Sequence, residues 1–208
     1  MEVKTGFRSA ADIARERYSF DEYQAFASRT ANGIPEKEDR IENALLGLIG
    51  ELGELSEPIK HARFHGHPFD LENATEEIGD CAWYAAWICS ESNLALSVAA
   101  GTNSVTAFQS AFGSVEMPTA EAEKWRRRTE YVFALIGDTE RVIRSADVFG
   151  LPIEPMRRYL RDLARLASSL DVKLSAALTS NIEKLNSRYP GSGGFSRERS
   201  INRKEGLP

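Results

Sequence analysis

Apolar residues recur at helical spacing along almost the whole chain, and no stretch shows the sustained alternation typical of a half-buried strand. The segment from residue 38 to residue 64, for example, carries Ile41, Leu45, Leu48 and Leu52 at intervals of three or four. Breaks that contain glycine and proline separate such segments and predict short connections between helices. The pattern therefore predicts an all-α protein built as a helical bundle.

These breaks divide the chain into successive predicted helices. We expect them at about residues 20–31, 38–64, 71–92, 96–112, 119–148, 153–170 and 173–189. Pro58 falls inside the second helix, so a kink or a break is expected near residues 54–57. Thr119 is the expected N-cap of the fifth helix. After Pro190 the chain is rich in glycine and serine and then basic, which predicts a tail with little core of its own.

Composition limits the class of protein. The chain has 208 residues, 42% of them hydrophobic and 27% charged, and we expect a single domain spanning residues 1–208. No apolar run approaches the roughly 18 to 20 residues of a membrane span, and the N-terminal sequence lacks the apolar core of a secretory signal. Cys81 and Cys89 lie too far apart on one predicted helix to pair, so we expect a reduced, cytoplasmic protein.

The charge is distributed unevenly along the chain. The net charge of −5 argues against a general nucleic-acid binder, and we expect no stable binding of nucleic acid. Between Glu51 and Asp80, however, eight acidic residues face two basic ones. From Asn181 to the end, six basic residues face three acidic ones. The first segment suits a metal ion and the second suits phosphate.

Two pairs of acidic residues stand out within the acidic segment. Glu51 and Glu54 lie three residues apart on one predicted helix, and Glu77 and Asp80 have the same spacing on the next. Each pair therefore leaves one helix face, and antiparallel packing of the two helices would bring four carboxylates together. Buried carboxylates are costly without a cation, and Mg²⁺ prefers oxygen ligands of this kind. The sequence thus predicts a metal site formed by these four residues.

The alternative is that the two pairs form exposed acidic helix faces. Three glycines lie beside the acids, at Gly50, Gly53 and Gly79. Because glycine costs about 1 kcal/mol in a helix interior, its presence here favours close backbone approach or room for a ligand.

The ordered motifs resemble those of the MazG-like nucleoside triphosphate pyrophosphohydrolases, which belong to the all-α NTP pyrophosphatase superfamily together with the dimeric dUTPases. Gly-Glu-x-Gly-Glu at 50–54 and Glu77-x-x-Asp80 carry the resemblance. Further similar segments lie at 20–24, 59–61, 64–68, 181–185, 188–190 and, as in phage-type members, 195–203. The resemblance covers residues 18–100 and 172–205. The chain departs from the family at Gly50, where the family usually has glutamate, and at about 101–162, which compact members lack.

The resemblance implies Mg²⁺-dependent hydrolysis of an NTP or dNTP to the nucleoside monophosphate and pyrophosphate, with Mn²⁺ as a substitute ion. It implies that Glu51, Glu54, Glu77 and Asp80 hold the metal and carry catalysis. It also implies a protein encoded by a bacterium or a phage and active in the cytoplasm. We expect a homo-oligomer, either a dimer or a tetramer, because a single acidic helical hairpin cannot bury both its faces. The alternatives are a dUTPase, a hydrolase of modified nucleotides or alarmones, and a non-catalytic nucleotide-binding helical module.

Basic residues near the C-terminus are candidates for holding the phosphates. Asn181, Lys184 and Arg188 lie at i, i+3 and i+7 and share a helix face, although an ordinary solvated basic stripe would look the same. Lys60 is a second phosphate candidate, and the resemblance adds Tyr189 to the substrate-binding set. The basic tail is expected either to close over phosphates as a lid or to be disordered.

We divide the expected domain into acidic metal-binding helices at about 38–93, an extra segment at about 101–162, and a closing helix with a basic tail at about 172–208. The extra segment is either an inserted hairpin or a decayed repeat. Leu-Ile-Gly-Glu at 48–51 resembles Leu-Ile-Gly-Asp at 135–138, and chance similarity among amphipathic helices is the alternative explanation. A decayed repeat would supply in cis what a second subunit normally supplies.

The remaining candidates favour ordinary structural roles. All three histidines lie between His61 and His67, where a contact with substrate or simple exposure is expected rather than a zinc site. Trp83 and Trp87 are expected to pack in the core rather than to stack on a base. Trp125 is expected on an exposed helix face.

Overall fold

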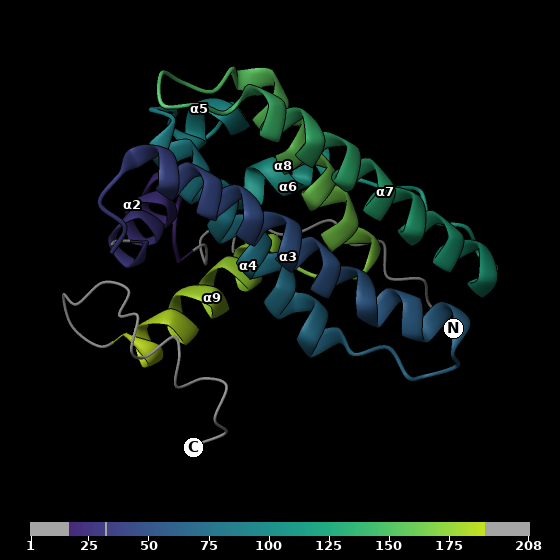
Figure 1. Ribbon diagram of the computed structural model, residues 1–208. Helices are drawn as coiled ribbons and strands as arrows, with labels where there is room; N and C mark the ends of the chain where they lie inside the picture. The colour runs from purple at the N-terminus through teal and green to yellow at the C-terminus, as the bar shows by residue number, and fades with distance from the viewer. Residues whose placement is uncertain (1–16, 32, 190–208) are drawn as a thin grey trace.

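The computed structural model describes residues 17–31 and 33–189, and within these ranges the regular structure is entirely helical (Figure 1). The chain is therefore all-α, as its periodicity predicted. The helices are α2 (Phe20–Thr30), α3 (Lys37–Phe64), α4 (Leu71–Glu91), α5 (Leu96–Ala100), α6 (Val105–Phe112), α7 (Glu121–Ser145), α8 (Ile153–Ser169) and α9 (Leu174–Arg188). The predicted basic tail lies outside the described residues.

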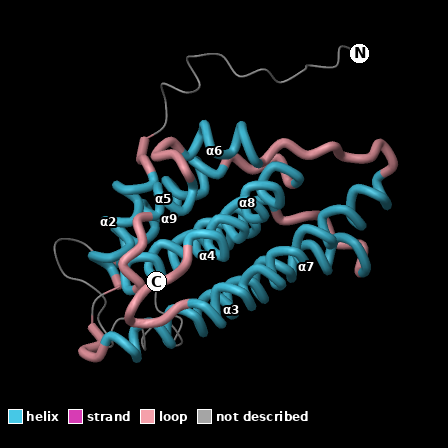
Figure 2. The backbone as a smooth tube through the Cα atoms, turned by 90° about the horizontal axis from the view of Figure 1, so that it is seen from above, coloured by secondary structure: helices cyan, strands magenta, loops and turns pink. Residues whose placement is uncertain are grey.

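Four long helices form the centre of the fold. Helix α3 packs on α4, α4 on α8, α8 on α7, and α7 back on α3. The axes of the four helices lie roughly alongside one another (Figure 2). Each contributes fully buried apolar side chains to one continuous core, among them Leu48, Ile78, Leu135 and Leu163. Helices α2 and α9 cover α4, while α5 and α6 pack against α8. The extra segment expected at 101–162 thus contains α6, α7 and the first part of α8, and α7 and α8 together form half of the central bundle.

Local capping explains several helix boundaries. Ser19 and Glu22 form a capping box at the start of α2, and the Asp70 side chain accepts a hydrogen bond from the Asn73 backbone N–H at the start of α4. Gly101 ends α5 with φ +78°, a left-handed conformation that glycine adopts without steric cost. The segment expected as one helix at 96–112 is therefore two short helices.

Two boundary predictions differ from the structure: the break expected near Pro58 is absent, while the alternative of a kink stays a prediction, and Thr119 is not an N-cap. Helix α3 runs without a break from Lys37 to Phe64, although Pro58 lies inside it. Pro58 and its neighbour Ile59 are buried against the core, so packing along α4 offsets the backbone hydrogen bond that proline cannot donate. Helix α7 begins at Glu121 after Ala120, which has no side chain able to cap it, so Thr119 is not the N-cap.

Buried tyrosines fix the central helix α4 at its midpoint. The Tyr23 hydroxyl of α2 lies 3.0 Å from the Gly79 carbonyl oxygen and 2.9 Å from the Asn181 side-chain oxygen, and these two acceptors share its one proton. The Tyr159 hydroxyl of α8 contacts the Cys81 carbonyl at 3.4 Å. Both tyrosines are fully buried. Cys81 and Cys89 are buried and free, as expected from their spacing. Among the described residues, no helix combines the length and the apolar character needed to cross a membrane.

Candidate functional site

Three carboxylates meet where α3 crosses the middle of α4. Glu51 comes from α3, and Glu77 and Asp80 come from successive turns of α4. One oxygen of each carboxylate lies within 4.8 Å of the others, a spacing that one metal ion can bridge. In the part of the chain that the structure describes, this acidic triad is the one group of histidine, cysteine, aspartate and glutamate side chains with such geometry. The expected pairing of acids on two packed helices is therefore present.

Glu54 lies outside the acidic triad. It is exposed on α3, one turn beyond Glu51, and it adds negative charge without joining the three close oxygens. The spacing from Glu51 was predicted to bring Glu54 in with the others. The structure instead places it at the rim, because the face of α3 that packs on α4 is centred on Leu48, Leu52 and Leu55.

Burial and mutual repulsion change the protonation of the triad. Burial, followed by the charges of Asp80 and Glu54, raises the pKa of Glu51 to about 8. Burial and the charges of Asp80 and Glu54 also raise the pKa of Glu77. The hydrogen bond of Glu77 with Glu51 and the charge of Lys184 lower that pKa, but less strongly. Near neutral pH and without a cation, the triad therefore retains a proton, which lies on Glu51.

This raised pKa gives a stability prediction. Glu51 binds its proton more tightly in the folded chain, at a pKa of about 8, than in the unfolded chain, at 4.5. The stabilisation is complete below about pH 4.5 and is lost as the pH rises through 8. We expect Glu51→Gln and the wild-type chain to melt at similar temperatures at pH 5, and the variant to melt higher at pH 8.5. Thermal melts in EDTA would test this. A difference in melting temperature between variant and wild-type chain that is the same at pH 5 and pH 8.5 would contradict it.

The acidic triad is joined directly by the basic helix α9. The Lys184 ammonium pairs with Asp80 and, at 2.8 Å, with Glu76. The Asn181 amide donates to Asp80 at 2.6 Å, and its oxygen accepts from the Tyr23 hydroxyl at 2.9 Å. Since Asn181 is buried and both ends of its amide are used, it positions Asp80, and the predicted contact of Asn181 with substrate stays a prediction.

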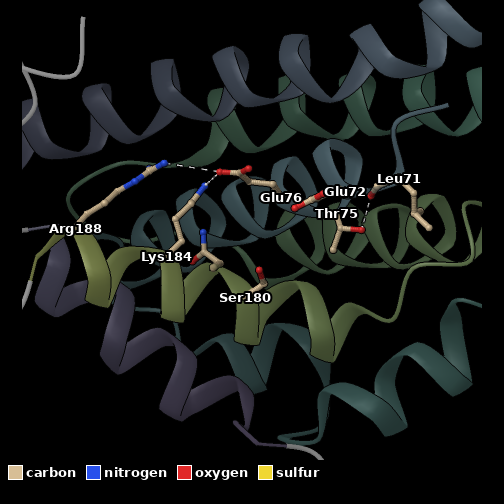
Figure 3. A pocket seen from close by; sticks show the side chains of 8 residues that line it. Leu71, Glu72, Thr75, Glu76, Ser180, Lys184 and Arg188 are labelled. Carbon is tan, nitrogen blue, oxygen red and sulfur yellow. Dashed lines mark hydrogen bonds and ion pairs between the residues drawn. The ribbon is translucent and has the colours of Figure 1, made fainter. Parts of the chain in front are cut away.

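A cleft of ≈ 720 Å³ opens between α4 and α9 beside the triad. In Figure 3, the side chains of Lys184 and Arg188 extend from α9 towards Glu76 on α4. Arg188 lies 3.8 Å from Glu76 and keeps 41% of its side chain exposed, so its guanidinium is accessible from the cleft. Lys184 and Arg188 thus share one face, as their spacing predicted.

A second, smaller pocket of ≈ 150 Å³ borders the triad on its other side. Its walls include two triad members, Glu51 and Asp80, together with Arg188 and four aromatic residues: Trp83, Tyr84, Trp87 and Tyr189. We call it the aromatic pocket. Trp87 is 3% exposed and belongs to the core, and the half-buried Trp83 packs against that core, as expected. Both rings also line the pocket. Tyr189 was expected at the substrate site, and it lines this wall.

Glycines explain two close approaches at the site. A Cβ on Gly79 would lie 2.9 Å from the Ala177 carbonyl oxygen of α9, so this glycine permits α9 to approach the triad. A Cβ on Gly47 would lie 2.1 Å from the Tyr84 ring, so Gly47 allows the tyrosine to lie against α3. At Gly50 and Gly53 no atom lies within 4 Å of the position that a Cβ would take, and both residues are exposed. Close approach therefore applies to Gly79 and not to Gly50 or Gly53.

Other candidates lie away from the triad. Lys60 pairs with Glu57 at 2.5 Å and lies nine residues beyond Glu51, or about 13 Å along the helix axis. The rings of His61, His65 and His67 lie 5.2–6.2 Å apart, centroid to centroid, without the ligand spacing of a metal site. Trp125 was expected on an exposed face but is half-buried against Phe69, with ring centroids 5.3 Å apart.

Several residues at the site have no strong signal in the sequence. Glu76 is one of many acids in its segment, yet it anchors Lys184 and Arg188. Tyr23 and Tyr84 follow the ordinary amphipathic pattern of their helices. Gly47 is the one of these with a usable signal, because a glycine in the middle of a helix indicates close packing or an open surface. Comparison with protein-family models, curated proteins and solved structures finds no match to this chain.

Proposed function

We propose that the chain is a hydrolase that depends on a divalent cation and cleaves nucleoside triphosphates to nucleoside monophosphate and pyrophosphate. The observation that carries this proposal is the acidic triad with a cationic cleft on one side and the aromatic pocket on the other. A nucleotide has the same three parts, namely phosphates that need cations, a sugar, and a flat base that stacks on aromatic rings.

The triad fits a hard cation. Its donors are all carboxylate oxygens, which suit Mg²⁺, with Mn²⁺ as a substitute. Its excess negative charge is balanced in part by Lys184 and by the proton on Glu51. Bound there, Mg²⁺ would neutralise phosphate charge and lower the pKa of an attacking water. Glu54 at the rim is the fourth carboxylate expected from the resemblance, and it would complete the ligand set from the solvent side.

The cationic side chains supply the positions for phosphate. Arg188 lines both the cleft and the aromatic pocket, so its guanidinium would bond phosphate oxygens in bidentate fashion while the base lies in the pocket. Lys184 would exchange its contact with Glu76 for one with a phosphate. Water then attacks at the α–β anhydride and pyrophosphate leaves. The proton of that water is accepted by Glu54, or by Glu51 once a bound cation has displaced the proton that Glu51 holds.

A nucleotide panel tests the proposal directly. The full-length chain is incubated with Mg²⁺ and each of the common NTPs and dNTPs, and with dUTP, oxidised or methylated triphosphates and guanosine tetraphosphate, and pyrophosphate release is measured. Turnover of at least one nucleotide that stops in EDTA supports the proposal. Turnover confined to dUTP, to a modified nucleotide or to the alarmone selects the corresponding alternative. Binding without turnover selects the non-catalytic module.

The aromatic pocket gives a separate prediction. Replacing Trp83 by alanine is expected to raise the KM for the preferred nucleotide about 10- to 100-fold and to leave kcat within a few-fold, because stacking of a base on an aromatic ring contributes about 1–3 kcal/mol. Phe149→Ala is the matched control, since that ring is 91% exposed and lines none of the pockets described above. Steady-state kinetics of both variants would decide, and equal KM values would exclude the pocket as the base site.

The expected dimer or tetramer stays a prediction. It rested in part on the inability of a single acidic hairpin to bury both its faces, but α7 and α8 cover the α3–α4 pair within this chain. Light scattering after size-exclusion chromatography measures the oligomeric state.

A further inference from the structure

A second cluster of charged residues lies between α7 and α8, away from the acidic triad. It surrounds a pocket of ≈ 180 Å³ whose walls are formed by six charged side chains: Asp138, Glu154, Arg158, Arg161, Asp162 and Arg165. We call it the arginine pocket. It does not share a lining residue with the cleft or with the aromatic pocket.

The acids of the arginine pocket are held by arginines. Asp138 is buried, pairs with Arg141, and lies 3.4 Å from the Arg158 guanidinium. Asp162 pairs with Arg165 at 2.8 Å. Burial and, less strongly, a hydrogen bond with Asp138 raise the pKa of Asp162, whereas the hydrogen bond and the charge of Arg165 lower it.

Arg161 forms no ion pair with a carboxylate of the described residues. It lies on α8 between Arg158 and Arg165, and its guanidinium is 4.5 Å from the centre of the Phe112 ring. Within the described ranges, no carboxylate lies within ion-pair distance of it, and its buried Nε has no hydrogen-bond partner. A buried donor without an acceptor is destabilising, so Arg161 is poised for an acceptor that residues 17–31 and 33–189 do not provide.

The arginine pocket follows the same spacing as the acidic triad, but an arginine replaces the second acid of each pair. Helix α3 carries Glu51 and, three residues on, Glu54, whereas α7 carries Asp138 and then Arg141 after the same Leu-Ile-Gly sequence. On α8, Asp162 is followed at the same spacing by Arg165, where α4 has a second acid after Glu77. Each second acid is thus an arginine, which repels a divalent cation and attracts an oxyanion.

We propose that the arginine pocket binds an oxyanion, namely a phosphate group, with Arg161 as its principal ligand and Arg158 and Arg165 as the flanking cations. Guanidinium groups suit phosphate because they offer paired N–H donors. The source of the phosphate group is either inorganic phosphate or the phosphoryl end of a nucleotide. This binding does not require the proposed hydrolysis.

The test measures binding to the full-length chain in EDTA, which keeps divalent cations from the acidic triad. Inorganic phosphate and a nucleoside monophosphate are titrated separately by calorimetry, at constant ionic strength with chloride as the control salt. We expect saturable binding by the wild-type chain and by Glu77→Gln. Arg161→Gln is expected to weaken it about 10-fold or more, since it removes a charge-assisted hydrogen bond. The arm that binds more tightly identifies the source of the phosphate group.

Arg144→Gln is the matched control, because Arg144 is an exposed arginine of α7 that pairs with Glu140 outside the pocket. It should bind phosphate as the wild-type chain does. Circular dichroism verifies that Arg161→Gln is folded, and Arg165→Gln provides a second variant with the same expected loss. Wild-type affinity in both pocket variants, or an equal loss in Arg144→Gln, would overturn the proposal, as would the absence of saturable binding in the wild-type chain.

Discussion

Glu77→Gln is expected to lower the rate of pyrophosphate release by about 100-fold or more. Glu77 is 6% exposed, belongs to the acidic triad, and accepts a hydrogen bond of 3.0 Å from the Asn73 amide. Glutamine has the same shape and can still accept that bond, but it carries no charge to hold a cation. Weakening a metal site through its outer partners already costs 10- to 100-fold, so loss of a ligand should cost at least as much.

The control for this experiment is Glu42→Gln, an exposed acid on α3 that lines none of the pockets described above. Its turnover and its dependence on Mg²⁺ should match the wild-type chain. Thermal melts should show Glu77→Gln to be at least as stable as the wild-type chain without metal, since the substitution removes repulsion within the triad. Wild-type turnover by Glu77→Gln would show that the acidic triad is not the catalytic centre.

The helices could be predicted from the sequence because each buries a continuous apolar stripe. Helix α4 shows this clearly, since its observed bounds, Leu71–Glu91, differ by one residue from those expected. The continuity of α3 through Pro58 could not be predicted, because it depends on packing along α4 rather than on local sequence. The arrangement of α7 and α8 as half of the bundle also depends on contacts between distant segments.

The candidate site was predictable only where its residues share one helix. The spacing of Glu77 and Asp80 predicted that both would project from one face, and both join the triad. The contact of Lys184 with Asp80 spans 104 residues, so periodicity could indicate a basic face but not its partner. The hydrogen bond of Asn181 with Asp80 was missed for the same reason, since the burial of Asn181 against Tyr23 is a property of the assembled fold.

The charges of the two clusters have one physical explanation. Each lies where a helix carrying Leu-Ile-Gly followed by an acid packs on a neighbouring helix that carries a second acid. Two buried carboxylates in that position require positive charge. Arginines supply it within the chain between α7 and α8, whereas Lys184 and a proton supply only part of it at the acidic triad. The remaining deficit is the reason to expect a cation at the triad alone.

Gly79→Ala is expected to reduce both stability and turnover. The added Cβ would lie 2.9 Å from the Ala177 carbonyl oxygen and 3.0 Å from the Cβ of Asn181, and the first of these is backbone that cannot rotate away. Helix α9 must therefore shift. Overpacking of this kind costs about 1–3 kcal/mol, and the better helix propensity of alanine returns up to about 1 kcal/mol. We expect the free energy of unfolding to fall by about 1–2 kcal/mol.

The same shift would move the Asn181 amide and the Lys184 ammonium relative to Asp80, and displacements of about 1 Å can cost 100-fold in rate. Gly50→Ala is the matched control on α3, where nothing lies within 4 Å of the new carbon, and it should raise the free energy of unfolding by up to about 1 kcal/mol. Urea denaturation and pyrophosphate release distinguish the two variants. If Gly79→Ala and Gly50→Ala change the free energy of unfolding and the turnover equally, the close contact of α4 with α9 does not hold the basic helix against the acidic triad.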